Sequence, residues 1–138
     1  MDCAFCGIVA GDREADVVYE DDAVVAFLDI RPLFPGHVLV VPRDHVVTIE
    51  DLPGDEVGPL FGAVRHLAGA VRTALEAEGI FVAQNNVVSQ SVPHLHVHVV
   101  PRRRGDGLRG FFWPRTGYRD DDHRETIASA VRRAAMGD

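Results

Sequence analysis

One short stretch, SVPHLHVHVVPR at 91–102, constrains the fold more than any other part of the sequence. Its histidines alternate one by one with apolar residues. Side chains alternate between the two faces of a β-strand, so the pattern predicts a strand over 94–100 with one polar and one apolar face. The polar face carries His94, His96 and His98, and the apolar face carries Leu95, Val97 and Val99. Because the apolar face belongs in the core, the three imidazoles are expected together on the opposite face.

Length and composition set the class of protein. With 138 residues, 46% of them hydrophobic and 25% charged, the chain matches a single domain over 1–138. No apolar run is long enough to cross a bilayer, so no membrane partner is expected. The formal net charge of −7 argues against extended binding to nucleic acid. The N-terminus lacks the basic start and apolar core of a secretory signal, and a cytoplasmic location is expected.

Hydrophobic periodicity predicts an α+β domain with a mainly antiparallel sheet. Apolar runs bounded by turn residues predict strands at 17–19, 23–29, 38–42 and 80–84, besides the histidine strand. A stripe at helical spacing, ended by Gly79, predicts one long helix over about 54–78. Short connections between the strands favour hairpins, with the long helix packed on one face of the sheet.

Three histidines on one strand face permit several chemistries. They could be exposed without a role, although strict alternation is unusual in that case. They could bind a catalytic metal, but same-face neighbours lie about 7 Å apart and zinc accepts nitrogen at about 2 Å, so one straight strand cannot bring all three to one ion. They could also act on phosphorus, with one imidazole as nucleophile and its neighbours holding phosphate oxygens. This third chemistry is favoured, and proton transfer alone is a weaker version of it.

The stretch QSVPHLHVHVVPR, from Gln90 to Arg102, resembles the signature of the histidine triad (HIT) family, in which alternating histidines follow an upstream glutamine. A second segment at 19–46, YEDDAVVAFLDIRPLFPGHVLVVPRDHV, resembles the family's hairpin and its Gly-His loop. The likeness covers roughly residues 3–102 and leaves 103–138 as a C-terminal extension. It implies a HIT-like domain that hydrolyses or transfers a nucleoside monophosphate group through a covalent nucleotidyl-histidine.

The resemblance assigns roles within the motif. As the middle histidine, His96 would be the nucleophile, and it would have to be neutral with its other N–H held by a backbone carbonyl. His98 would hold oxygens of the reacting phosphate. Gln90 and the hydroxyl of Ser91 would contact the phosphate or the leaving group. Since attack on phosphorus is in-line, positioning and charge stabilisation would supply most of the rate gain.

The resemblance also implies a purine nucleotide in a cleft beside the triad. Asp29 matches the family's ribose-binding carboxylate, and His37, which follows Gly36, matches another active-site histidine near the phosphate. The residues that match the base pocket, and that would equally suit a core, are Phe5, Ile8, Phe27 and Ile30.

The loop before the triad departs from the family pattern. The family often has Asn-Gly-x-x-Ala-Gly-Gln there, whereas this chain has QNNVVSQ at 84–90, about two residues shorter, with Ser89 in place of the Gly before Gln90. Glycine offers a backbone N–H with unrestricted φ, so the phosphate cradle is expected to differ in shape. Either Asn85 or Asn86 would take the role of the family's substrate-contacting Asn.

Cys3 and Cys6 form a C-x-x-C pair, which by itself suits a zinc knuckle, a redox pair or two buried thiols. No βαβ pattern follows the pair, which disfavours a thioredoxin-like role. Family members that begin with C-x-F-C resemble zinc proteins whose other ligands are the His of a P-[KR]-x-H segment and the first triad histidine, here His45 and His94. The resemblance therefore implies one structural Zn²⁺ per chain, closed to water.

Beyond Arg102 the resemblance weakens. The aromatic cluster GFFWPR at 110–115 is expected to cap the domain's core or to be buried across a dimer, and the family's usual homodimer is the expectation. Carboxylates at 120–122 suit a helix N-terminus, which predicts a C-terminal helix that buries Ile127, Val131 and Ala134.

Three functions remain open at this point. The first is a nucleotide hydrolase or transferase that cleaves the α-phosphate bond of a purine nucleoside phosphoramidate or a dinucleoside polyphosphate. The second is a nucleotide-binding or scaffold protein with incidental catalysis, which would bind nucleotide tightly without turnover. The third is a metal-dependent hydrolase that uses the triad itself as ligands, whose activity a chelator would remove and a divalent metal restore. The first is favoured, with the leaving group and the base preference left open.

Overall fold

The computed structural model describes residues 3–108 and 115–137. The chain divides into two compact units, Met1–Asp106 and Gly107–Asp138. The motif region predicted at 3–102 lies in the first unit, and a single domain over 1–138 stays a prediction. The aromatic residues of the cluster at 110–115 lie outside the described residues. Within the described ranges, no helix is both long enough and apolar enough to cross a membrane.

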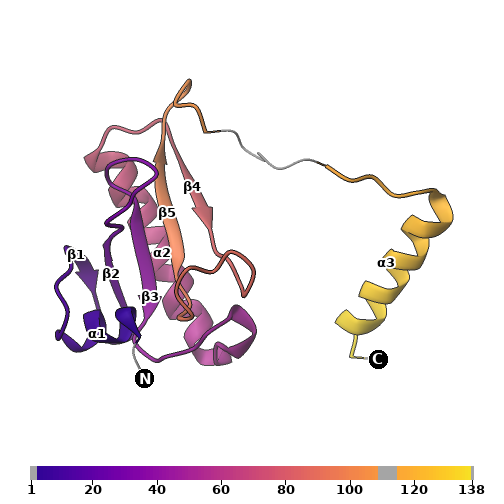
Figure 1. Cartoon of the computed structure of the whole chain (residues 1–138), viewed down its shortest axis with the longest axis horizontal. Helices are drawn as coiled ribbons and strands as arrows, with labels where there is room; N and C mark the ends of the chain where they lie inside the picture. The colour runs from indigo at the N-terminus through magenta and orange to yellow at the C-terminus, as the bar shows by residue number, and fades with distance from the viewer. Residues whose placement is uncertain (1–2, 109–114, 138) are drawn as a thin grey trace. The chain divides into compact units, whose positions relative to one another are not determined.

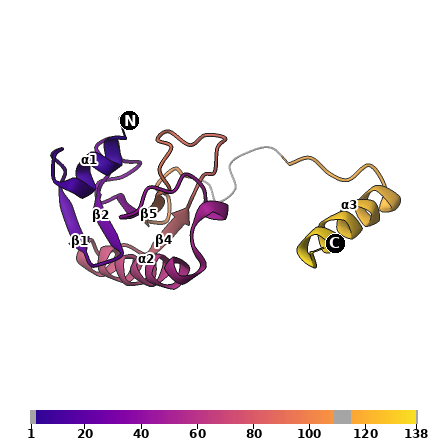
Figure 2. The same cartoon turned by 90° about the horizontal axis from the view of Figure 1, so that it is seen from below.

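The first unit contains a five-stranded antiparallel sheet, which confirms the predicted α+β class. Its strands lie in the order β1-β2-β3-β5-β4. Their bounds are β1 Val17–Glu20, β2 Val24–Leu28, β3 Val38–Pro42, β4 Gly79–Ala83 and β5 Val97–Arg102. Helix α1 (Ala4–Ala10) and helix α2 (Gly54–Ala74) lie on opposite faces of this sheet, as Figure 1 and Figure 2 show, and a 3-10 turn, η1 (Ile49–Asp51), precedes α2.

The sheet separates two apolar clusters. The larger one joins α2 to one sheet face and contains Leu95, Val97 and Val99, as the alternation predicted. The smaller one joins α1 to the other face and includes Phe5 and Phe27. The triad histidines, which alternate with the residues of the larger cluster, therefore lie on the side of the sheet that α1 covers.

Helix α2 ends at Ala74, earlier than the predicted limit of 78. Leu75 is its C-cap, and Glu76 takes a left-handed conformation with φ 52° that a helix cannot continue. Gly79, which predicted the end of the helix, instead begins β4. The boundary was misplaced because the turn is made by a non-glycine residue, which carries no sequence signal for a left-handed conformation.

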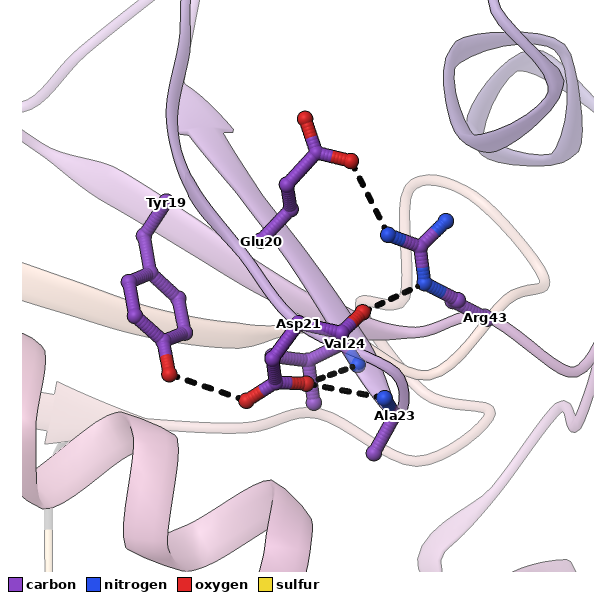
Figure 3. A network of polar contacts seen from close by, with 6 residues as sticks. All are labelled: Tyr19, Glu20, Asp21, Ala23, Val24 and Arg43. Carbon is purple, nitrogen blue, oxygen red and sulfur yellow. Dashed lines mark hydrogen bonds and ion pairs between the residues drawn. The ribbon is translucent and has the colours of Figure 1, made fainter.

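Asp21 organises the turn between β1 and β2, the hairpin predicted from its acidic sequence (Figure 3). One carboxylate oxygen accepts hydrogen bonds from the backbone N–H groups of Ala23 and Val24 at 2.8 and 2.9 Å. The other accepts one from the Tyr19 hydroxyl at 2.9 Å, and Arg43 Nε donates to the Asp21 carbonyl at 2.7 Å. The carboxylate thus supplies the acceptor for two backbone N–H groups of the turn.

The short helix α1 was not predicted. Cys3 is its N-cap and accepts a hydrogen bond from the Cys6 N–H at 3.3 Å, while Gly11, with φ 82°, ends it. Phe5 and Ile8 repeat at helical spacing and end near a glycine, which was the available signal. The C-x-x-C spacing indicates a chemical motif, and nothing in it signals that Cys3 also caps a helix.

The second unit has one helix among its described residues, α3 (Asp121–Ala135), which begins where the acidic cluster predicted. Asp120 is the N-cap and accepts a hydrogen bond from the His123 N–H at 2.7 Å. The expectation that α3 buries Ile127, Val131 and Ala134 is not met within the described part of this unit, where no residue of α3 is buried. The described part of this unit has no second helix or strand to cover an apolar face.

Candidate active site

The triad starts in the approach to β5 and not within the strand. The strand begins at Val97, so the prediction of regular strand from 94 is wrong for its first residues. The approach is nevertheless fixed, because the Leu95 N–H donates to the Val46 carbonyl at 2.8 Å. His94 and His96 are 0% and 2% exposed. Two of the three histidines are therefore buried before the sheet begins to pair.

His96 has one definite tautomer. Its Nδ1 lies 2.7 Å from the carbonyl oxygen of His94, and a carbonyl only accepts, so Nδ1 carries the hydrogen. In the neutral form of the ring, the lone pair therefore lies on Nε2. The ring of Phe5 meets that of His96 edge-on, with centroids 5.0 Å apart, and restricts its rotation. This is the arrangement that nucleophilic attack by an imidazole requires.

A second chain of hydrogen bonds sets the tautomer of His98. The backbone N–H of Leu33 donates to His37 Nδ1 at 3.0 Å, so His37 carries its hydrogen on Nε2. That Nε2 lies 2.9 Å from His98 Nδ1 and donates to it. His98 therefore carries its hydrogen on Nε2. An N–H donor at that position suits the anionic oxygen of a phosphate.

Burial keeps these two histidines neutral. It lowers the pKa of His37, although Asp29, whose Oδ2 is 3.7 Å from His37 Nε2, opposes the shift. Burial, together with the neighbouring His96 and His37, lowers the pKa of His98 to about 4, although Asp29 opposes the shift. The contact between Asp29 and His37 is consequently a charge facing a neutral N–H at neutral pH, and not an ion pair.

The shifted pKa of His98 predicts a dependence of stability on pH. Its pKa is about 4 in the folded chain against an ordinary 6.5, so the unfolded chain binds more protons between those values. We expect the free energy of unfolding to fall as the pH drops from about 6.5 to about 4. Urea unfolding at several pH values should show a shallower fall for His98→Asn. Equal slopes for both proteins would contradict the assignment.

Asp29, His37 and His98 also bring three possible metal-ligand atoms within 4.8 Å of one another. Two of these atoms, His37 Nε2 and His98 Nδ1, already share one hydrogen. A metal on His37 Nε2 would require the hydrogen to move to Nδ1, where it would oppose the Leu33 N–H. The cluster is therefore better suited to fix the tautomer of His98 through hydrogen bonds than to bind a cation. Nor do the three triad rings converge on one ion, since each Nδ1 faces a different partner.

A cavity of about 260 Å³ lies beside the triad. Its apolar wall contains all four residues predicted for the base pocket: Phe5, Ile8, Phe27 and Ile30. Its polar lining includes Asp29, Ser91, His96 and His98. The sequence prediction missed three charged residues that also line it, Arg13, Glu14 and Arg31. Their positions follow from the course of the loops after α1 and β2, which no motif marks.

The predicted polar residues of the preceding loop are engaged within the chain. Gln90 Nε2 donates to the Val47 carbonyl at 2.6 Å, and its Oε1 accepts from the Val87 N–H at 2.9 Å. Asn86 Oδ1 accepts from the Ile49 N–H at 2.7 Å, and Asn85 Nδ2 donates to the Ser89 carbonyl at 3.2 Å. In the described part of the chain, Gln90, Asn85 and Asn86 do not line the cavity. Their substrate contacts stay predictions, and each would require these amides to exchange partners.

This loop stores backbone strain. Val87 and Ser89 have φ values of 70° and 63°, in the left-handed region that side chains disfavour. Ser89 holds this conformation at the position where the family has Gly. Since a β-branched residue suffers most there and Asn tolerates it, we expect Val87→Asn to raise the free energy of unfolding by about 1 kcal/mol. Val88→Asn is the control, because Val88 is similarly exposed (79% against 72%) without a positive φ. Equal urea midpoints for the two variants would count against the strain.

Four residues from three separate segments gather at the N-cap of α1. The ligand atoms of Cys3, Cys6, His45 and His94 lie within 4.8 Å of one another. The Sγ-to-Nδ1 distances are 3.4 Å (Cys3–His94), 3.5 Å (Cys6–His94) and 3.2 Å (Cys6–His45). Ligands around a tetrahedral zinc would stand about 3.6 Å apart for S and N. The predicted set therefore fits one Zn²⁺ with little movement.

The protonation states in this cluster also suit a metal. His94 Nε2 lies 2.9 Å from the Pro42 carbonyl and donates to it, so Nδ1 faces the sulfurs with a free lone pair. Burial lowers the pKa of His94, which favours the neutral ligand form. Burial, together with Cys3, raises the pKa of the Cys6 thiol, so the thiol needs a nearby cation to ionise at neutral pH.

Comparison with known proteins identifies the family. The model of the HIT domain matches residues 10–105, which include the triad, Asp29 and His37. The chain belongs to the HIT domain family. Among curated HIT relatives, "Protein hit" of Bacillus subtilis is 37% identical over 138 residues, covering 96% of this chain and 94% of that protein. The adenosine 5'-monophosphoramidase hnt1 of Schizosaccharomyces pombe is 34% identical over 116 residues, covering 83% and 84%.

Solved HIT structures share the fold. A HIT family protein from Bacillus subtilis superposes with a TM-score of 0.86 at 34% identity, covering 96% of each chain. A zinc-bound histidine triad family protein from Mycobacterium smegmatis superposes with a TM-score of 0.74 at 37% identity, covering 99% of this chain and 98% of that one. The HIT fold is thus established for this chain, and the cysteine-histidine cluster is a candidate metal site.

Proposed function

We propose that this HIT protein cleaves the α-phosphate bond of a purine nucleoside phosphoramidate or dinucleoside polyphosphate through a covalent nucleotidyl-His96 intermediate. One observation carries the proposal. The His94 carbonyl holds the Nδ1–H of the buried His96 at 2.7 Å, which leaves Nε2 as the free nitrogen of a ring that lines the cavity. The Schizosaccharomyces pombe relative, named as an adenosine 5'-monophosphoramidase, supports the choice of reaction.

The first chemical step would form the intermediate. The Nε2 atom of His96 attacks the α-phosphorus, a phosphorus–nitrogen bond forms, and the bond to the leaving group breaks. The leaving amine or phosphate departs with the electron pair, and an amine takes a proton from solvent. The imidazole becomes positive, and its Nδ1–H bond to the His94 carbonyl stabilises that charge.

The second step would regenerate the enzyme. Water attacks the same phosphorus, the bond to Nε2 breaks, and the nucleoside monophosphate is released with a proton to solvent. In both steps the Nε2–H of His98 would donate to a phosphate oxygen, its tautomer fixed by His37 and the Leu33 N–H. Asp29 at the cavity wall would accept hydrogen bonds from the ribose hydroxyls. Ser91 would contact the phosphate or the leaving group.

We also propose that Cys3, Cys6, His45 and His94 hold one structural Zn²⁺ per chain. Zinc bound there would supply no chemistry and would only fix protein segments in place, because four protein ligands leave no open position. The zinc-bound relative from Mycobacterium smegmatis and the fit of the four ligand atoms support this. His94 would then serve two purposes, with its ring in the metal site and its carbonyl on the nucleophile.

Substrate assays test the reaction. The protein is incubated with a purine nucleoside 5'-phosphoramidate and with a diadenosine polyphosphate, and the nucleoside monophosphate formed is quantified by chromatography. We expect turnover of at least one substrate type. Tight nucleotide binding with turnover of neither would favour the scaffold alternative. A homodimer and a cytoplasmic location, expected from the sequence, stay predictions that light scattering and cell fractionation can check.

A further inference from the structure

Two adjacent charged residues, Arg13 and Glu14, line the same cavity as the apolar residues Phe5, Ile8 and Phe27. They belong to the segment between α1 and β1, and neither has a role in the proposed bond cleavage. Apolar walls pack against the faces of a purine ring, which do not distinguish one purine from another. Charged groups at the same pocket can contact the polar edges of the ring, where purines differ.

The segment that carries these residues is tied to α1. The backbone N–H groups of Asp12 and Arg13 both donate to the Gly7 carbonyl, at 2.9 and 3.2 Å. The Arg13 side chain also lies against Gly7, since a Cβ added there would stand 3.3 Å from Arg13 Cβ. Arg13 is therefore held beside the helix that supplies Phe5 and Ile8. This places Arg13 in the lining of the cavity next to the wall that those two residues form.

Both charged groups are available to a ligand. Over residues 3–108 and 115–137, the guanidinium of Arg13 and the carboxylate of Glu14 have neither an ion pair nor a side-chain hydrogen bond. Arg43 and Arg104 show the contrast, since each forms an ion pair, with Glu20 at 2.9 Å and Glu78 at 2.6 Å.

We propose that Arg13 and Glu14 make this pocket select guanine over adenine, an inference that rests on the proposed nucleotide site. Guanine presents two adjacent acceptors, O6 and N7, that match the two-pronged donor of an arginine. Its N1–H and N2 amino group match a carboxylate acceptor. Adenine replaces O6 by an amino donor, which opposes the guanidinium, and its N1 is an acceptor, which opposes the carboxylate. Both charges therefore favour the same base.

Calorimetric binding of GMP and AMP to the full chain, purified with zinc, tests the inference without requiring turnover. We expect GMP to bind about ten-fold or more tightly than AMP, the discrimination typical of one good bidentate contact. Arg13→Leu, and the charge-keeping Arg13→Lys, should weaken GMP binding and bring the two affinities within about two-fold. Glu14→Gln should reduce the preference in the same direction. Arg65→Leu, the same charge change at an exposed position of α2 on the other face of the sheet, should leave it intact.

Each outcome has a distinct meaning. Equal affinity of the unmodified protein for GMP and AMP would overturn base selection and leave the proposed reaction standing. A GMP preference that survives both Arg13 variants and Glu14→Gln would overturn the assignment to these residues. Failure to bind either nucleotide would refute the proposed nucleotide site itself, and the inference with it.

Discussion

Replacing His96 with Asn should abolish turnover while nucleotide binding persists. Asn can still donate a side-chain N–H toward the His94 carbonyl, but it offers no nucleophilic lone pair to phosphorus. Since the covalent route would be lost, we expect the rate to fall by at least about 10³-fold. The measurement is steady-state release of nucleoside monophosphate, together with calorimetric binding of that product.

A matched control separates this effect from a general loss of structure. His66→Asn makes the same chemical change at an exposed histidine of α2, on the face of the sheet opposite the triad. It should keep the rate of the unmodified protein. His96→Asn must keep the melting temperature and the affinity for product for the comparison to hold. If it also kept full activity, the nucleophile would have been assigned incorrectly.

Removing zinc should destabilise the first unit and weaken nucleotide binding together. The four proposed ligands join the N-cap of α1 to the segments that carry His45 and His94. Helix α1 also supplies Phe5 and Ile8 to the cavity. We expect Cys6→Ser to lower the free energy of unfolding by at least about 2 kcal/mol, a shift in melting temperature on the order of 5 °C or more. Affinity for the product nucleotide should fall in the same variant.

Chelation provides an independent form of the same test. A strong chelator should lower the melting temperature of the unmodified protein but not that of Cys6→Ser, whose site is already incomplete. Added zinc should restore the unmodified protein alone. Elemental analysis should find one zinc per chain as purified. A zinc-free preparation whose melting temperature is unchanged by chelator would show that the four residues are a thiol-imidazole cluster without a metal.

Much of the fold was predictable because buried positions recur at regular spacing along strands and helices, and apolar residues occupy them. Leu95, Val97 and Val99 alternate with the triad, and they do face α2. The strand predicted at 38–42 has the observed bounds of β3. Two of the errors had other causes. Glu76 ends α2 through a backbone conformation that its side chain does not signal, and α3 has an apolar pattern but no buried residue.

The candidate site divides in the same way. The resemblance to the HIT family implied that His94 would lie with Cys3 and Cys6, while His96 and His98 would share a cavity with Asp29. The groups that set the tautomers could not be predicted in detail, because the Leu33 N–H and the Pro42 carbonyl are backbone atoms whose positions depend on the completed fold. Arg13 could not be predicted for the same reason, because its place in the cavity lining depends on backbone hydrogen bonds between its segment and α1.

Trapping the covalent intermediate tests the central claim most directly. The protein is mixed with a purine nucleoside phosphoramidate, quenched within the first turnover in alkali, where a phosphorus–nitrogen bond to imidazole survives, and digested for mass spectrometry. We predict one nucleoside monophosphate group on the peptide that contains His96, located on that residue by fragmentation and missing from His96→Asn. Turnover with no adduct at any time point, or an adduct on another residue, would contradict the proposed mechanism.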